Sequence, residues 1–282
     1  MEPGSCSDLA ASVSASLSEI SLFSLAHAPL LAYVRSKARP LNFEELLRQD
    51  VPVLYVGESH PDGASKIFLA QNMVLLKKSG ITHIGMEMFN SNRQPLLNEY
   101  FAGRASRNDV LDLLDGEWGW RANDYMKLVD SAMAEGIQIV ALNGRHLLKL
   151  MPKQSHSSEL KFRDEHMASV LADLVLKTPN AKVLALVGFA HARYDSSSSG
   201  EVYQPQILLG SKNIGSVSYI IDYLDPRFSG NKSPLRVVKG PIRTAVEDSG
   251  LSSQWLFLPV PREKALCDGY IFIDALSSVG ER

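Results

Sequence analysis

The sequence predicts an α/β fold with a mostly parallel central sheet and helices on both of its faces. Short apolar runs end repeatedly at glycine, and segments with helical apolar spacing lie between these runs. Strands that alternate with helices of this length form βαβ units, whose right-handed crossovers give a parallel sheet covered on both faces. The composition agrees, because 45% of the 282 residues are hydrophobic and 21% are charged, which suits one substantial core.

Six segments have the pattern of strands. The first, residues 51–56, has its proline near its start, where a strand tolerates a missing N–H, and stops at Gly57. Runs of this kind, rich in β-branched residues and bounded by glycine, are typical of strands buried on both faces. The predicted strands are residues 51–56, 81–88, 137–142, 183–187, 217–221 and 270–275.

Helical segments fill the intervals between the predicted strands. Residues 64–79 have apolar side chains at helical spacing and stop at Gly80, a residue type that commonly ends a helix. The predicted helices are residues 64–79, 95–102, 107–115, 124–135 and 160–177. The stretch 225–261 is rich in Pro, Gly and Ser, which favours long loops over the edge of the sheet.

The first segment differs from the rest in composition. Residues 1–24 include eight serines and no lysine or arginine, and the first basic residue is Arg35. The positive and continuous apolar regions of a Sec signal peptide are both missing. Two interpretations remain: a flexible terminus, or a leader for another export system, since Ser-rich, base-poor N-termini resemble type III secretion signals. We therefore expect a leader over residues 1–40 and a single α/β domain over residues 41–282.

Composition also argues against several classes of protein. The formal net charge is -2 and no basic run is interleaved with aromatic residues, so we expect no nucleic-acid partner. No apolar stretch approaches the roughly 20 residues that span a bilayer. Cys6 and Cys267 stand at opposite ends of the chain and form neither a disulfide framework nor a CxxC metal pair.

Ionisable and polar residues follow four successive predicted strands. Glu58 and His60 follow the first, Glu87 ends the second, Asn143 and Arg145 follow the third, and His191 follows the fourth. Ligands of open parallel sheets bind outside the carboxyl ends of the strands, so these side chains are expected to share one site. Histidine can abstract a proton at cellular pH, a carboxylate can orient its ring, and arginine can bind a negative group.

Other residues and interpretations belong to the same prediction. Lys66, near the start of the following helix, is a candidate anion contact, and Tyr125 with Trp118-Gly119-Trp120 is a candidate apolar wall for a ligand. Glu87 has an alternative role as a helix cap or as a partner of Arg93. Histidine and carboxylate side chains also suit zinc or manganese, but no HExxH-type spacing is present, so we expect no metal.

An ordered series of short motifs between about residues 50 and 210 resembles a known family. The motifs are Gly57-Glu58-Ser59-His60, Gly85-Met86-Glu87-Met88-Phe89, Arg163-Asp164-Glu165-His166-Met167-Ala168 and Val187-Gly188-Phe189-Ala190-His191. They look like the pattern of ChaN-like proteins in the Tiki superfamily, which also includes haem-uptake proteins, EreA-type erythromycin esterases and a domain of the Pasteurella-type toxin.

The resemblance implies a set of site residues and a mechanism. It places the active site on Glu58, His60, Glu87 and His191, with His60 as general base and without an obligatory metal. ChaN-like sequences usually carry a further histidine just beyond the first motif, where this chain has Ser65-Lys66-Ile67. The lipoprotein signal of haem-uptake members is missing too. We therefore expect neither haem nor any other cofactor.

The whole chain resembles HopBA-type effectors, which plant-pathogenic bacteria inject through a type III system. This resemblance implies delivery into the plant cytoplasm, contact with a host immune receptor or another host protein, and cell death after recognition. It makes the leader interpretation of the N-terminus the favoured one. We expect a hydrolase-like effector with an unknown small-molecule substrate. The alternatives are a protein that binds haem or another tetrapyrrole, and a non-catalytic protein whose surface is recognised.

Overall fold

The structure is a computed structural model that describes residues 27–47, 51–153, 155–193, 205–223, 241–251, 255–260 and 267–273. Residues 1–26 of the predicted leader lie outside the described residues, as do residues 225–240, 252–254 and 261 of the stretch predicted as loops. Within the described part, no helix is long and apolar enough to cross a membrane.

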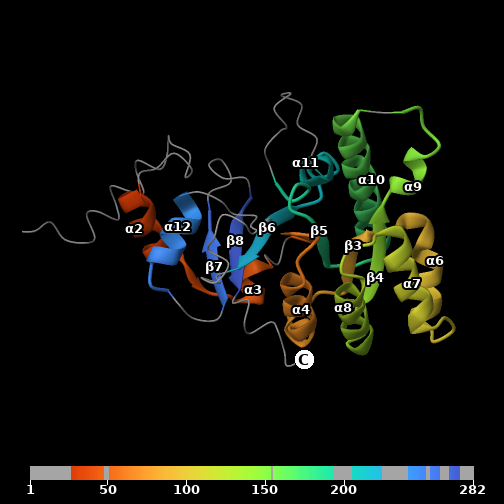
Figure 1. Cartoon of the computed structure of the whole chain (residues 1–282), viewed down its shortest axis with the longest axis horizontal. Coiled ribbons are helices and arrows are strands. Elements are labelled where there is room, and N and C mark those ends of the chain that lie inside the picture. Colours follow the sequence, from red (N-terminus) through yellow and green to blue (C-terminus); the bar gives the residue numbers. More distant parts are fainter. Residues whose placement is uncertain are drawn as a thin grey trace, which may run out of the picture.

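An eight-stranded sheet forms the centre of the molecule, in the order β1-β7-β8-β6-β2-β5-β3-β4 (Figure 1). All neighbours from β8 to β4 pair in parallel, whereas β7 runs antiparallel to both β8 and β1. The predicted mostly parallel sheet is confirmed. The strands are β1 Arg39–Pro40, β2 Val53–Glu58, β3 His83–Asn90, β4 Gln138–Asn143, β5 Val183–Gly188, β6 Ser216–Tyr223, β7 Trp255–Pro259 and β8 Gly269–Ile273.

Helices cover both faces of this sheet, as predicted. The segments are α2 His27–Lys37, α3 Phe43–Leu46, α4 Ala64–Gln71, α5 Met73–Lys78, the 3₁₀ turn η2 Ser91–Arg93, α6 Gln94–Phe101, α7 Arg107–Glu117, α8 Ala122–Ala134, α9 Arg145–Leu148, α10 His156–Lys177, α11 Pro205–Gly210 and α12 Pro241–Asp248. In Figure 1, α2 and α12 lie together at one end of the molecule, and α6 and α7 at the other.

The two faces of the sheet carry separate apolar cores. Alternate residues of β2 divide between them: Leu54 and Val56 face the core shared with α3 to α8, while Val53 and Tyr55 face the core shared with α2, α10, α11 and α12. All four side chains are buried. A strand that is apolar on every residue is therefore required here, which explains why period-2 alternation is missing from this run.

Two predicted elements differ from the structure. The helix predicted over residues 64–79 is divided into α4 and α5 at Asn72, whose side-chain amide donates to the carbonyl oxygen of Phe68 at 2.8 Å. Part of the stretch predicted as loops, residues 225–261, forms α12 and β7. The Pro, Gly and Ser residues that indicated loops there stand mostly outside the two elements, and β7 pairs along the whole of β8.

Residues 27–40, which the sequence placed in the leader, contribute an ordered helix and a short strand. Leu30 and Val34 of α2 are buried in the second core, and the Tyr33 hydroxyl donates to the carbonyl oxygen of Pro259 at 3.0 Å. Strand β1 pairs with β7. This part of the chain therefore packs as part of the domain.

Candidate active site

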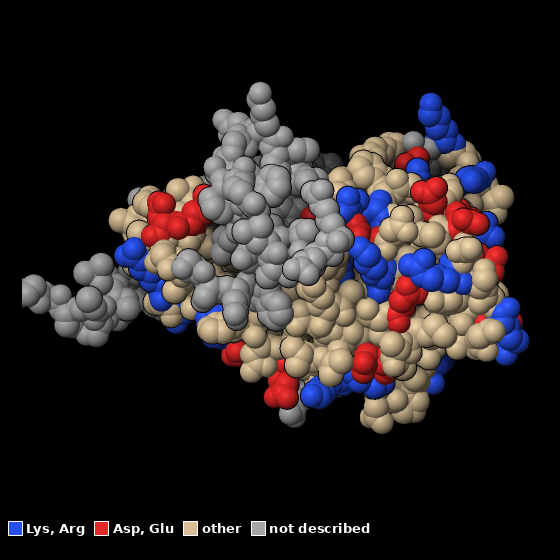
Figure 2. Space-filling model, turned by 60° about the horizontal axis from the view of Figure 1, so that its bottom comes forward, with Lys and Arg blue, Asp and Glu red and all other residues tan. Residues whose placement is uncertain are grey.

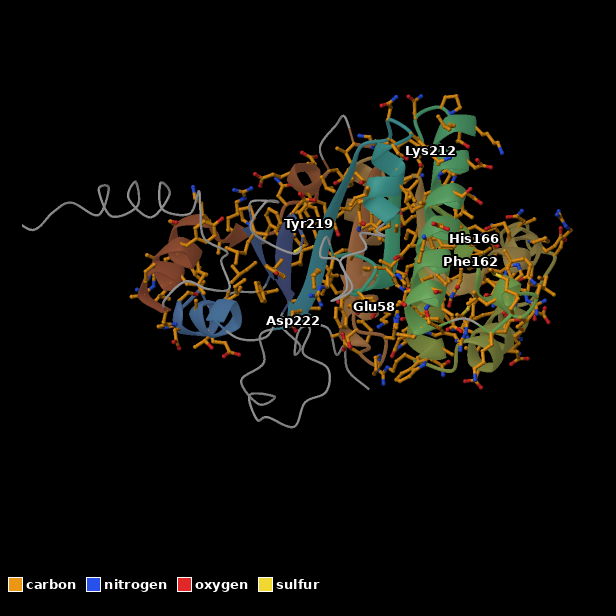
Figure 3. All side chains as sticks on the ribbon, turned by 90° about the horizontal axis from the view of Figure 1, so that it is seen from above. Glu58, Phe162, His166, Lys212, Tyr219 and Asp222 are labelled. Carbon is orange, nitrogen blue, oxygen red and sulfur yellow. The ribbon has the colours of Figure 1, made fainter. Side chains whose placement is uncertain are left out.

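The carboxyl ends of three adjacent strands bring the predicted residues together. Strand β5 lies between β2 and β3, and Glu58 at the end of β2 is in register with Gly188 at the end of β5. Glu87 approaches from β3, and His191 follows β5 directly. Figure 3 shows Glu58 at this end of the sheet and Lys212 near the opposite end. Because parallel strands end at one rim of the sheet, Glu58 and His191 lie at the same site although they are 133 positions apart in sequence.

Glu58 and His60 form a hydrogen-bonded pair. The distance between His60 Nδ1 and Glu58 Oε1 is 2.7 Å, and the Glu58 side chain is fully buried while 26% of the His60 side chain is exposed. A carboxylate accepts only, so His60 Nδ1 carries the hydrogen of this bond when Glu58 is ionised. In the neutral imidazole with this tautomer, the other ring nitrogen, Nε2, has the lone pair that a general base needs.

A second cluster surrounds Glu87, which is 1% exposed. The backbone N–H of Gly188 donates to Glu87 Oε2 at 2.6 Å, Arg163 is ion-paired with Oε1, and His191 Nε2 is 3.3 Å from Oε1. Burial alone would raise the pKa of Glu87, but the charges and hydrogen bonds of His191 and Arg163 outweigh it and hold that pKa well below its usual range. Glu87 is therefore a carboxylate at any physiological pH.

His191 is a second cation of this cluster, beside Arg163. Its Nδ1 is 2.6 Å from Asp164 Oδ1 on α10, so both ring nitrogens face carboxylates. Burial alone would lower the pKa of His191, but Glu87 and Asp164 raise it to about 10. Burial raises the pKa of Asp164 itself. Only 5% of His191 is exposed to solvent, and its Nε2 contacts the Glu87 carboxylate instead.

His60 Nε2 sits between the two clusters. It lies 3.8 Å from Glu87 Oε2, and a Cβ atom added to Gly188 would stand 2.6 Å from it. Glycine at position 188 is therefore what allows the imidazole to approach the end of β5. On another side, the Trp118 ring meets the imidazole edge to face, with ring centroids 4.7 Å apart. Of the predicted aromatic wall, Trp118 therefore lies against the imidazole.

The four residues predicted to bind substrate occupy different positions. Asn143 is buried, and its amide donates to the carbonyl oxygen of Glu87 at 2.9 Å, so it supports the end of β3. Arg145 begins α9 and is exposed at the rim. Lys66 and Tyr125 are both fully buried behind Glu58. Lys66 is ion-paired with Glu58 Oε2, and the Tyr125 hydroxyl donates to Oε1 at 2.6 Å.

Arg163 and Asp164 complete the site, although sequence reasoning did not single them out as site residues. They stand side by side on α10, yet Arg163 reaches Glu87 and Asp164 reaches His191. Strand-end reasoning does not find residues in the middle of a helix. The available signal was the motif from Arg163 to Ala168, which contributed to the family resemblance.

The face in Figure 2 carries Lys and Arg side chains near its middle, with Asp and Glu among them.

No group of three or more His, Cys, Asp or Glu side chains within the described ranges is arranged to hold a metal ion. A histidine that ligates haem iron needs a ring nitrogen free of competing partners. Both ring nitrogens of His191 face carboxylates at 3.3 Å or less, so His191 does not fit haem. Nε2 of His60 lies against Gly188 and 3.8 Å from Glu87 Oε2, which leaves little space for a porphyrin on that nitrogen.

We expect haemin titrated into the purified full-length chain to give no saturable one-to-one shift of its Soret band. The physical reason is that iron ligation by His191 would have to displace a charged hydrogen bond, and that His60 Nε2 lies against Gly188 and close to Glu87. Absorbance spectroscopy with a haem-binding globin apoprotein as positive control checks this. A stoichiometric, saturable Soret shift that is lost in His60→Ala would contradict it.

Comparison with known proteins finds similarity to one family over part of the chain. Residues 43–150 match the model of the family described as haem-binding uptake, Tiki superfamily, ChaN. The similarity to that family therefore covers the segment from α3 to α9. This segment contains Glu58, His60 and Glu87, whereas Arg163, Asp164 and His191 lie beyond the ChaN-like match.

Similar proteins include toxins, effectors and esterases. The multifunctional-autoprocessing repeats-in-toxin protein of Vibrio vulnificus is 27% identical over 161 residues, which is 56% of this chain and only 3% of that toxin. The type III effector HopBA1 aligns with a TM-score of 0.50 and 12% identity, over 79% of this chain and 87% of its own. The erythromycin esterase EreC aligns with a TM-score of 0.55 and 13% identity, over 83% and 97%. Both structures share the fold of this chain.

Proposed function

We propose that the protein is a bacterial effector with a hydrolase-like site in which His60 is the general base. The observation that carries the proposal is the Glu58–His60 pair, with Nδ1 tied to a buried carboxylate at 2.7 Å and the ring partly exposed. Its position at the carboxyl ends of parallel strands is where enzymes of this architecture bind substrate. The fold shared with HopBA1 and EreC supports both parts of the proposal.

The proposed chemistry follows from the side chains at the rim. His60 Nε2 accepts a proton from water as that water adds to an ester or amide carbonyl, and Glu58 stabilises the imidazolium that forms. Returning this proton to the leaving group releases the product. Arg145, exposed beside the buried Asn143, is the proposed contact for a negative group of the substrate.

The proposed site of action is the plant cell, after delivery through a type III system. The Ser-rich segment over residues 1–24 and the fold shared with the type III effector HopBA1 support this part. The proposed partner is a host immune receptor or another host protein. Recognition of the effector or of its product would then lead to cell death.

Expression of the full chain in leaf cells tests the proposal. Wild type is expected to cause cell death, measured as ion leakage, and His60→Ala to cause none, because removing a general base costs about 10²–10⁴-fold in rate. His156→Ala is the matched control, since His156 is exposed at the start of α10. Equal accumulation and equal melting temperature must be shown for the three proteins.

Two results would separate the alternatives. If folded His60→Ala protein caused the full response, the site would not be needed, and surface recognition of a non-catalytic protein would replace the catalytic part. Substitutions on the surface that abolish the response, with His60 intact, would then identify the recognised face. If wild type caused no response, the proposed recognition in the plant cell and the cell death that follows it would fail.

A further inference from the structure

Lys66 is a fully buried lysine whose ammonium hydrogens all have acceptors. It is 0% exposed on α4, is ion-paired with Glu58 Oε2, and donates to the backbone carbonyl oxygens of Ser59 at 2.8 Å and His60 at 3.3 Å. The Tyr125 ring lies below the ammonium, 4.9 Å from its centroid. Lysine is almost never fully buried unless it is paired. The ion pair between Lys66 and Glu58 therefore accounts for the burial of this ammonium.

The Glu58 carboxylate is the point that connects this cation to His60. Oxygen Oε1 accepts from His60 Nδ1 at 2.7 Å and from the Tyr125 hydroxyl at 2.6 Å. Oxygen Oε2 accepts from Lys66, and from the Ser65 hydroxyl at 3.4 Å. Burial and the charge of Glu58 raise the pKa of Tyr125, so Tyr125 supplies a hydrogen bond but no charge.

The other charged groups around the Glu58–His60 pair are bound to partners of their own. Glu87, across from His60 Nε2, is paired with Arg163 and His191. Asp62, at the start of α4, accepts the backbone N–H groups of Ala64 and Ser65. Arg121, before α8, is paired with Asp124 at 2.6 Å. Among the described residues, the positive charge in direct contact with Glu58, apart from His60 when protonated, is therefore that of Lys66.

We infer that Lys66 is a positioning residue that sets the protonation of His60 through Glu58, an inference that rests on the proposed role of His60 as a base. With Lys66 charged, Glu58 is an anion, His60 donates through Nδ1, and Nε2 is free to accept a proton. Lys66 also fixes the direction of the ring, because it binds the carbonyl oxygens of both residues that lead from Glu58 to the imidazole. The role expected from the sequence, direct contact with a substrate anion, is replaced by this one.

Removing the positive charge has a defined consequence. A buried carboxylate without its cation takes up a proton more readily, and the Glu58–His60 pair then holds one proton more at neutral pH. That proton has two arrangements: a neutral Glu58 that donates to Nδ1, or an imidazolium beside an anionic Glu58. Nε2 carries a hydrogen in both arrangements, so His60 loses its function as a base in either case.

Nitrogen-15 NMR of the histidine side chains in the full chain tests the inference without a substrate. In neutral His60 of wild type, the hydrogen is expected on Nδ1, which faces Glu58, and Nε2 is expected to carry the lone pair. In Lys66→Met, which keeps the chain length without the charge, the apparent pKa at which Nε2 loses its proton is expected to rise by roughly one unit or more. Lys66→Arg, if folded, is expected to restore the wild-type value. His60→Ala assigns the signal.

Tyr125→Phe is the matched control, because it removes a hydrogen bond to the same carboxylate and no charge. Its His60 pKa is expected to stay within a few tenths of the wild-type value. If Lys66→Met folds and leaves the pKa unchanged, or if Tyr125→Phe raises it by a full unit, the inference is wrong. If the Lys66 variants fail to fold, Tyr125→Phe still tests the inference. A rise of a full unit in that variant would show that the hydrogen bond, and not the charge of Lys66, sets the His60 pKa. Because no activity is measured, a failed leaf assay with a shifted pKa would reject only the proposed function.

Discussion

Glu87→Gln is expected to lower the free energy of unfolding by about 3–5 kcal/mol, the usual cost of breaking a buried charge pair by removing one partner. The substitution keeps the size of the side chain and removes its charge. It leaves Arg163, 17% exposed, and His191, 5% exposed, without the carboxylate that both now contact. The backbone N–H of Gly188 also exchanges a carboxylate acceptor for an amide. Equilibrium unfolding in urea, followed by circular dichroism, measures the change.

Glu99→Gln is the matched control for this experiment. Glu99 forms an ion pair with Arg104 on the surface, with hydrogen bonds of 2.6 and 2.8 Å. Surface pairs contribute little because water screens them, so this variant is expected to unfold at nearly the wild-type urea concentration. Equal destabilisation in the two variants would show that the buried cluster contributes no more than an ordinary surface pair.

The strand-end residues could be predicted because a parallel sheet imposes their geometry. Once β2, β3 and β5 are recognised as buried parallel strands, Glu58, Glu87 and the residues after Gly188 must reach one rim. No knowledge of side-chain contacts is needed for this step. The order β2-β5-β3 also explains why Glu87 of β3 meets His191. His191 follows β5, which is adjacent to β3 in the sheet although the two strands are far apart in sequence.

The direction of individual side chains could not be predicted in the same way. Position 66 in a helix following the first motif is compatible with an exposed or a buried lysine. Only the packing of α4 against α8 places its ammonium over the Tyr125 ring. Arg163 and Asp164 are adjacent in sequence, so a helical period alone assigns them to different directions. Both reach the site, because Arg163 extends from α10 to Glu87 and Asp164 extends from α10 to His191.

The antiparallel strand β7 shows another limit of the pattern. Its sequence Trp-Leu-Phe-Leu-Pro contains a proline and stands in a stretch rich in Pro, Gly and Ser. Local composition therefore favoured a loop. Proline is tolerated in β7 because Pro259 stands at its last residue. The pairing of β7 with β8 joins residues that are distant in sequence, so the local sequence pattern does not predict it.

Alkaline pH is expected to remove about 5 kcal/mol of stability between roughly pH 6.5 and 10, through the loss of the His191 charge. Histidine in the unfolded chain has its ordinary pKa, whereas Glu87 and Asp164 raise the pKa of His191 in the folded protein to about 10. The folded state therefore binds this proton more tightly. Its contribution is complete below the unfolded pKa and declines as pH rises, until it is lost above the folded pKa.

The difference between two proteins isolates this contribution from other groups that titrate in the same range. In His191→Gln the free energy of unfolding is expected to be lower than in wild type at pH 6.5, and the gap is expected to close as pH approaches 10. His27→Gln, which removes an exposed histidine paired with Asp248, is expected to follow wild type throughout. Urea unfolding at half-unit steps of pH measures all three proteins. A gap between wild type and His191→Gln that stays constant with pH would mean that His191 is neutral in the folded protein, and that the Glu87 carboxylate is held by Arg163 and the Gly188 N–H alone.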